Sequence, residues 1–93
     1  MRFSAATRSA TTDVGAGALL FLRFMPKPEN EESGFYVTPL ATVASGDEPL
    51  QSPQWTTLAV EAEVPEAADS VVIGLVMAGN GIAWFGDLAF AAA

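Results

Sequence analysis

The sequence offers little that could carry out catalysis. Its 93 residues include no histidine and no cysteine, which removes the commonest general base and the usual imidazole and thiolate ligands of transition metals. Carboxylates remain, and Glu61 and Glu63 form a pair with a usable spacing. On one face of a strand they would stand roughly 7 Å apart, a separation that inverting glycosidases use. Both are expected to face water, however, so an enzyme is the third of three functions that we consider.

Aromatic and arginine side chains suit binding better than catalysis. Phe21 and Arg23 alternate on one face of an apolar segment, and Phe85 has the parity of Asp87 in a later one. Tyr36 lies beside the acidic loop. Exposed aromatic rings stack on sugars and line ligand pockets, and a guanidinium binds carboxylates and hydroxyls. We therefore expect a ligand-binding sheet face that carries Phe21, Arg23, Tyr36 and Phe85.

The same residue types also have structural interpretations, which stay open at this point. Arg23 would then pair with a carboxylate such as Glu61 or Glu63, because buried charges are normally paired. Trp84 shares parity with Phe90 in the last apolar segment, and this favours a core position for Trp84. In a chain this short most aromatic side chains are needed for the core.

Neither a metal site nor a phosphate-binding loop is predicted. Asp87 is preceded by Gly86, so no second carboxylate stands beside it to hold a cation. The segment Gly79-Asn80-Gly81 lies between two strand-like segments, whereas glycine loops that bind phosphate connect a strand to a helix. We predict a turn at this segment and no cofactor.

The charge balance disfavours nucleic acids and membranes as partners. Eleven acidic residues face four basic ones, and the formal net charge is −7, which repels phosphate backbones and anionic headgroups. The apolar segment Val71–Phe90 is interrupted by Gly79-Asn80-Gly81, which would break a spanning helix. The N-terminal segment lacks a small-residue cleavage site before Pro26. We expect a soluble protein, with the cytoplasm favoured and the compartment otherwise undetermined.

The elements that must position the candidate residues are short strands. Apolar or alternating segments separated by glycine and proline predict an antiparallel β-sandwich of jelly-roll type, formed as one domain by residues 1–93. At its centre we expect Val71–Phe90 as a buried β-hairpin with its turn at Ala78–Gly81. The other expected strands are Met1–Arg8, Ala18–Met25, Phe35–Leu40 at an edge, and Trp55–Val64, in which Leu58 and Val60 face the core.

From Trp55 onward the sequence follows the pattern W-x2-L-x-V-x-A-x-VPEAADSVVIGLVMAGNGIAWFGDLAF. This pattern resembles the C-terminal part of galactose-binding-like jelly-roll modules, such as the sandwich modules appended to some bacterial transcriptional regulators and erythromycin-esterase-like proteins. It is more distantly similar to carbohydrate-binding modules. The segments Arg2-Phe3-Ser4-Ala5 and Ala18–Arg23 look like two preceding strands. The resemblance implies the fold, and binding of a small or carbohydrate-like ligand.

The sequence departs from that family in two places. Such modules usually carry an acidic pair near the last strand, where this chain has Gly86 before Asp87, so the structural calcium of the distant relatives is not expected. The family also has strands before the Arg2–Ala5 element, which implies a shortened sandwich. A shortened sandwich exposes an edge and an apolar face, and we expect a homodimer or higher homo-oligomer to cover them. A purely structural or assembly module is therefore the alternative to a ligand-binding module.

Overall fold

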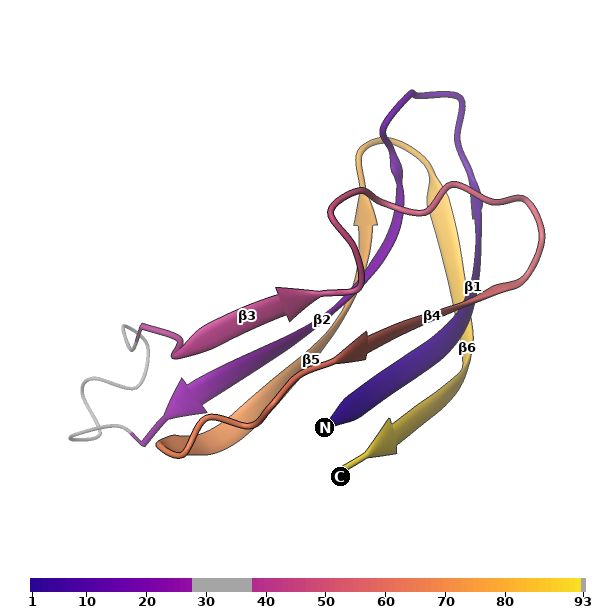
Figure 1. Ribbon diagram of the computed structural model, residues 1–93. Coiled ribbons are helices and arrows are strands. Elements are labelled where there is room, and N and C mark those ends of the chain that lie inside the picture. Colours follow the sequence, from indigo (N-terminus) through magenta and orange to yellow (C-terminus); the bar gives the residue numbers. More distant parts are fainter. Residues whose placement is uncertain (28–37, 93) are drawn as a thin grey trace.

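The computed structural model describes residues 1–27 and 38–92. These residues form strands and irregular segments and no helix, so the expected all-β architecture is confirmed. Within them there is no helix long and apolar enough to cross a membrane. The strands are β1 (Arg2–Ala10), β2 (Gly17–Pro26), β3 (Ala41–Ala44), β4 (Thr56–Glu61), β5 (Ala68–Ala78) and β6 (Ile82–Ala91) (Figure 1).

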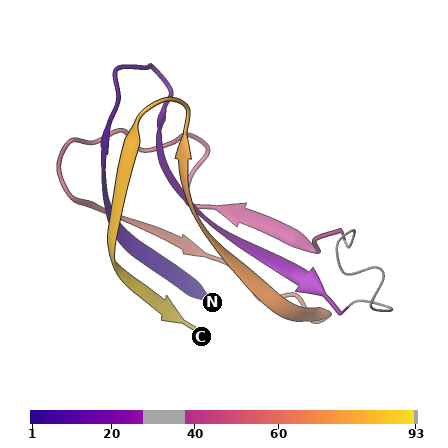
Figure 2. The same cartoon turned by 180° about the vertical axis from the view of Figure 1, so that it is seen from behind.

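The strands make two antiparallel sheets of three strands each, in the orders β4-β1-β6 and β3-β2-β5. The arrangement is that of a small β-sandwich. Consecutive strands repeatedly change sheet: β1 and β2 are in different sheets, and so are β5 and β6. In Figures 1 and 2 the β1–β2 connection and the β5–β6 connection lie side by side at one end of the molecule, and β5 and β6 diverge from there.

The predicted hairpin at Val71–Phe90 is therefore wrong. Its two strands exist and its turn lies at residues 79–81, but β5 pairs with β2 and β6 pairs with β1. The turn is held against the β1–β2 connection, where the Thr11 hydroxyl donates to the Asn80 carbonyl at 2.6 Å. Gly79 has a φ of 83°, and a Cβ there would lie 2.7 Å from the Ala16 Cβ. This close packing of two connections directs β5 and β6 into opposite sheets.

The core forms where the two central strands face each other. β1 buries every second residue, including Phe3 and Ala5, and β2 buries the alternate set Leu20, Leu22 and Phe24. This is the alternation expected for Met1–Arg8, and it confirms a strand at Ala18–Met25. The residues of this core cluster are Phe3, Ala5, Leu20, Leu22, Phe24 and Val60.

The edge strands β3 and β4 match the sequence-based prediction less closely. β4 ends at Glu61, three residues before the predicted end, although Val60 is buried and Leu58 packs against the core as expected. The predicted strand Phe35–Leu40 is displaced: Thr38–Leu40 are not in a strand and β3 begins at Ala41, while residues 35–37 lie outside the described part of the chain. Pro39 has no amide hydrogen for a sheet, which is consistent with a strand that begins only after it.

Residues 45–55 cover one end of the sandwich. Leu50 exchanges two backbone hydrogen bonds with Ala18, both 2.9 Å long. The Ser9 amide donates to the Ser52 carbonyl at 2.7 Å, and the Ser52 amide donates to the Ser9 hydroxyl at 3.0 Å. Because these bonds join β1 and β2 through the same segment, they hold the two sheets together at the end where the connections meet.

Candidate functional site

Two of the four predicted binding residues do come together. Phe21 and Arg23 lie on the outer face of the β3-β2-β5 sheet, and the guanidinium carbon Cζ of Arg23 lies 5.0 Å from the centre of the Phe21 ring. The Arg23 Nε donates to the Thr42 hydroxyl at 3.3 Å. The Phe21 ring covers Gly74 of β5 so closely that a Cβ at residue 74 would overlap it. Arg23 thus already has an aromatic partner and a hydrogen-bond partner within the protein.

The other two predicted residues do not join them. Phe85 belongs to β6 in the other sheet and packs against the core cluster, so the prediction that it shares a face with Phe21 and Arg23 is wrong. The chain crosses from one sheet to the other between β5 and β6. Within the second sheet a β-bulge at Asp87 reverses the parity of β6, so that Phe85, and not Trp84, shares the inward face of Leu88 and Phe90. Trp84 correspondingly faces outward, with 38% of its surface exposed, and is not a core residue. Tyr36 lies outside the described residues.

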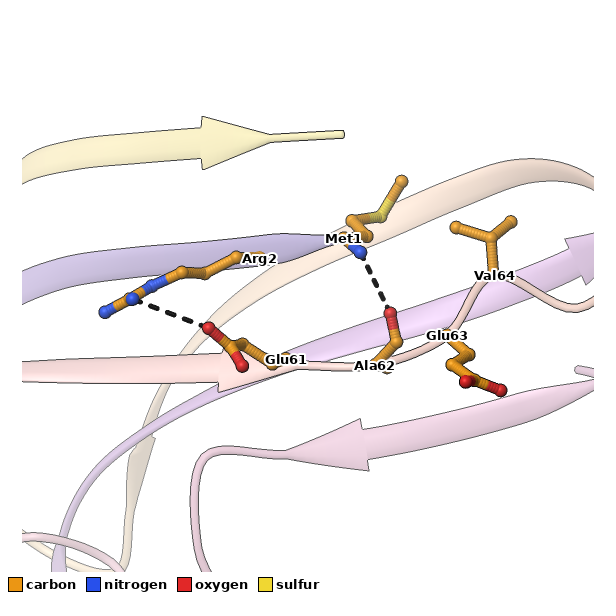
Figure 3. Close-up of a pocket in the computed structure, with 6 residues that line it drawn as sticks. All are labelled: Met1, Arg2, Glu61, Ala62, Glu63 and Val64. Carbon is orange, nitrogen blue, oxygen red and sulfur yellow. Dashed lines mark hydrogen bonds and ion pairs between the residues drawn. The ribbon is translucent and has the colours of Figure 1, made fainter. Parts of the chain in front are cut away.

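The carboxylate pair does not form a catalytic arrangement. Glu61 binds Arg2, with Nη1 and Oε1 3.4 Å apart, in an exposed ion pair. Figure 3 shows this pair beside the bond from the N-terminal amine to the Ala62 carbonyl, and Glu63 pointing away from it. Because β4 ends at Glu61, the strand spacing assumed for Glu63 does not apply. Glu61 therefore pairs with Arg2 and not with Arg23. Within residues 1–27 and 38–92, no three acidic side chains gather in a way that could hold a metal ion.

The most distinctive feature of the structure is an apolar groove between β5 and β6. Its volume is about 320 Å³. Four large side chains at this groove keep between 42% and 58% of their surface exposed. Two come from β5 and two from β6, and Phe3 of β1 lies beneath them. The lining residues are Phe3, Ile73, Leu75, Leu88, Ala89 and Phe90.

These exposed side chains have the orientation of core residues. Ile73 is directly opposite Leu22 and Leu75 is opposite Leu20, and residues opposite each other in a ladder point to the same face of the sheet. Leu20 and Leu22 are fully buried. Ile73 and Leu75 therefore belong to the interior layer, but β5 is the last strand of its sheet and none of the described residues covers them.

The two edges beside the groove differ in how well they are protected. β5 carries no charged side chain from Ser70 to Ala78, and its pairing with β2 is regular from Gly17↔Ala78 to Met25↔Ser70. β6 is interrupted by the bulge and charge of Asp87. Charges and bulges are the devices by which natural sheets prevent pairing at an edge. β5 is thus the unprotected edge, and β6 is the protected one.

A second feature, absent from the predicted site, lies on the outer face of the β4-β1-β6 sheet. Arg8 is opposite Trp84 in the ladder, and its Cζ lies 4.4 Å from the centre of the Trp84 ring. On the other side the Cζ lies 5.8 Å from the ring of Trp55, which precedes β4. Register could have revealed this row, because the β1–β4 pairing Thr7↔Thr56 places Trp55 next in line with Arg8.

Comparison with known proteins identifies no relative: no family model matches the sequence, and neither a curated protein nor a solved structure is significantly similar to it. The site must therefore be interpreted from its own geometry. The geometry provides an uncovered apolar groove beside an unprotected strand edge, and a half-buried arginine between two indole rings on the other sheet.

Proposed function

We propose that this protein is an assembly module in which a second copy of the chain covers the groove between β5 and β6. The observation that carries the proposal is the exposure of Ile73, Leu75, Leu88 and Phe90, which are oriented as core residues. Uncovered apolar patches of this kind mark interaction sites in soluble proteins. A domain of this size also has little stability to spare when part of its interior layer remains in water.

The unprotected edge of β5 favours a second copy over an unrelated partner. Two β5 strands related by a two-fold axis perpendicular to the sheet would run antiparallel and join two three-stranded sheets into one of six strands. Each side of such an interface uses the same surface, so one sequence satisfies both. Ile73 and Leu75 would then face their counterparts in the second copy across a shared interior layer.

The protected edge of β6 contributes side chains without extending its sheet. Asp87 and its bulge prevent regular strand pairing along β6. Leu88 and Phe90 nevertheless project into the groove, where they would pack on the apolar surface of the second copy. In the proposed dimer the two β3-β2-β5 sheets would therefore join into one continuous sheet, whereas the two β4-β1-β6 sheets would contact the second copy through side chains only.

Charge limits how tightly the copies associate but does not oppose the proposed contact itself. Each copy has a formal net charge of −7, and two such molecules repel one another over about one Debye length, ~8 Å at physiological salt. The groove is lined by apolar side chains, with Phe3, Ile73, Leu75, Leu88, Ala89 and Phe90 around it. The groove lining thus carries none of the charge that causes the repulsion.

Binding of a small or carbohydrate-like ligand at Phe21 and Arg23 has less support, because Arg23 already donates to Thr42 and Phe85 belongs to the interior of the other sheet.

The test is the oligomeric state of a pair of lysine variants. Leu75→Lys places a charge in the groove, whereas Leu40→Lys places the same charge before β3, at the opposite edge of the sheet. The two leucines have the same exposed fraction, 42%. In sedimentation equilibrium we expect a dimer for the wild-type chain and for Leu40→Lys, and a monomer for Leu75→Lys. A wild-type protein that remains monomeric at high micromolar concentration would exclude the proposal.

A further inference from the structure

The outer face of the β4-β1-β6 sheet holds an arginine between two tryptophans. Arg8 lies at the centre of the row, 4.4 Å from the Trp84 ring centre and 5.8 Å from that of Trp55, both within the range of a cation–π interaction. Trp55 is 55% exposed and Trp84 is 38% exposed. They are the two tryptophans of the chain. A row of this kind presents one positive charge and two indole surfaces to solvent together.

Within residues 1–27 and 38–92, Arg8 lacks the partners that arginines in proteins normally have. Its Nε is buried and makes no hydrogen bond to any of these residues. In the described part of the chain the ion pair found is that of Arg2 with Glu61, and no carboxylate lies within ion-pair distance of Arg8. Arg23 on the other sheet provides an internal comparison, because it also lies over an aromatic ring but donates its Nε hydrogen to Thr42. Within the described residues, the Arg8 guanidinium therefore has donor capacity left to bind a further acceptor.

The surface beside the row is made largely of small side chains. Ala6 of β1 is opposite Gly86 of β6 and Thr57 of β4, and Ser4 is opposite Ala89 and Ala59. These small side chains project little above the sheet, and the Trp55 ring extends to within 3.9 Å of the Cβ position of Gly86. A flat ligand could lie along this surface with its edge at Arg8. The surface belongs to a different face from the groove between β5 and β6.

We infer that Trp55, Arg8 and Trp84 form a binding site for a small acid whose carboxylate is carried on a ring. The carboxylate would accept hydrogen bonds from the Arg8 guanidinium, which presents a planar fork of donors suited to it. The apolar face of the ring would stack on an exposed indole. This chemistry is shared by sugar acids and by aromatic acids. The site is independent of self-association through β5.

The surrounding charges explain why affinity should depend on salt and on one nearby aspartate. Asp87 is three residues from Trp84 along β6, roughly 10 Å by strand rise. Glu61 is at the far end of the face, opposite Arg2 and six residues from Arg8 along β1, roughly 20 Å away. Arg2 already offsets Glu61. Of these two carboxylates, Asp87 is thus the nearer one to the Arg8 row.

Intrinsic fluorescence reports on this site alone, since both tryptophans belong to it. The probes are two matched pairs: methyl β-D-glucuronide against methyl β-D-glucoside, and benzoate against benzyl alcohol. We expect a saturable change in tryptophan emission with at least one acid, and binding of its neutral counterpart weaker by about tenfold or more. Whichever acid binds identifies the source of the ring. Binding of both acids would mean that the site recognises a carboxylate carried on a ring of either kind.

Variants separate recognition from loss of structure. Arg8→Gln should abolish the response and Arg8→Lys should weaken it, because lysine keeps the charge but lacks the planar fork. Arg23→Gln, on the other sheet, is the matched control and should bind as wild type does. The titration is repeated with the Leu75→Lys variant, so that failure of the dimer leaves the binding result intact. The inference is overturned if neither acid changes the emission up to tens of millimolar, if neutral and acidic probes bind equally, or if Arg8→Gln binds unchanged.

Discussion

Asp87 forms a β-bulge opposite Ala5, where two residues of β6 face one residue of β1. Ser4 pairs with Ala89 and Ala6 pairs with Gly86, so both Asp87 and Leu88 lie across from Ala5. Asp87 has a φ of 49°, in the left-handed region that aspartate tolerates better than most residues. Because of this extra residue, Phe85 faces the interior before the bulge and Leu88 and Phe90 line the groove after it.

The first prediction concerns that backbone conformation. Asp87→Val should lower the free energy of unfolding by about 1–2 kcal/mol, because a β-branched residue is strained in the left-handed region. Asp87→Gly should be close to neutral, since glycine adopts this conformation readily. Urea unfolding at a single protein concentration measures both, because the stability of an associating protein depends on concentration. Equal destabilisation by valine and glycine would show that the bulge does not depend on the left-handed residue.

The second prediction concerns the contact of Phe21 with Gly74. A Cβ on residue 74 would overlap the Phe21 ring, so Gly74→Ala should cost about 1–3 kcal/mol of stability, as overpacking does. Removing the ring in Phe21→Ala should eliminate most of the cost of Gly74→Ala. The double-mutant cycle should therefore show strong coupling between the two substitutions in the free energy of unfolding. Additive effects of the two substitutions would contradict the contact.

The third prediction compares two buried hydroxyls on β1. The Thr7 hydroxyl is buried and has no hydrogen-bond partner among residues 1–27 and 38–92, so Thr7→Val should raise the free energy of unfolding by about 1 kcal/mol or more. The Ser9 hydroxyl accepts a hydrogen bond from the Ser52 amide, so Ser9→Ala should lower it by about 1 kcal/mol. Thermal or urea unfolding gives both values. A loss of stability in Thr7→Val would mean that its hydroxyl is satisfied in solution.

The fourth prediction concerns salt. If two copies with a net charge of −7 associate through an uncharged groove, raising the ionic strength screens their repulsion without weakening the contact. The dimer dissociation constant should therefore fall as sodium chloride is raised from low to physiological concentration. Sedimentation equilibrium across a salt series measures it. A dissociation constant that rises with salt would indicate an interface held by ion pairs instead.

Local patterns in the sequence predict the central strands and fail at the features that join them. Alternation identifies the buried faces of β1 and β4, and the continuous apolar segment Ala18–Met25 identifies β2, because both patterns follow from strand geometry. Whether Val71–Phe90 folds within one sheet or across two depends on the packing of Gly79 against Ala16, a contact between residues 63 positions apart. No local pattern contains it.

The candidate site was harder to predict for the same reason. Phe21 and Arg23 are two residues apart on one strand, so their shared face follows from the sequence alone. Phe85 is separated from Phe21 and Arg23 because β5 and β6 belong to different sheets. It shares a face with Leu88 and Phe90 because the bulge at Asp87 shifts the register by one residue, which moves every later side chain to the other face. The row of Trp55, Arg8 and Trp84 joins β1, β6 and the residue before β4 through pairings that only the folded chain defines.

Backbone hydrogen exchange along β5 tests the proposed assembly most directly. The β5 amides that do not bond to β2 are unpaired in a single copy and become paired if a second β5 lies beside them. The account predicts that these amides are protected at high protein concentration and exchange rapidly on dilution, while the outer amides of β6 around Asp87 exchange rapidly at both. Rapid exchange of the outer β5 amides at every concentration would contradict it.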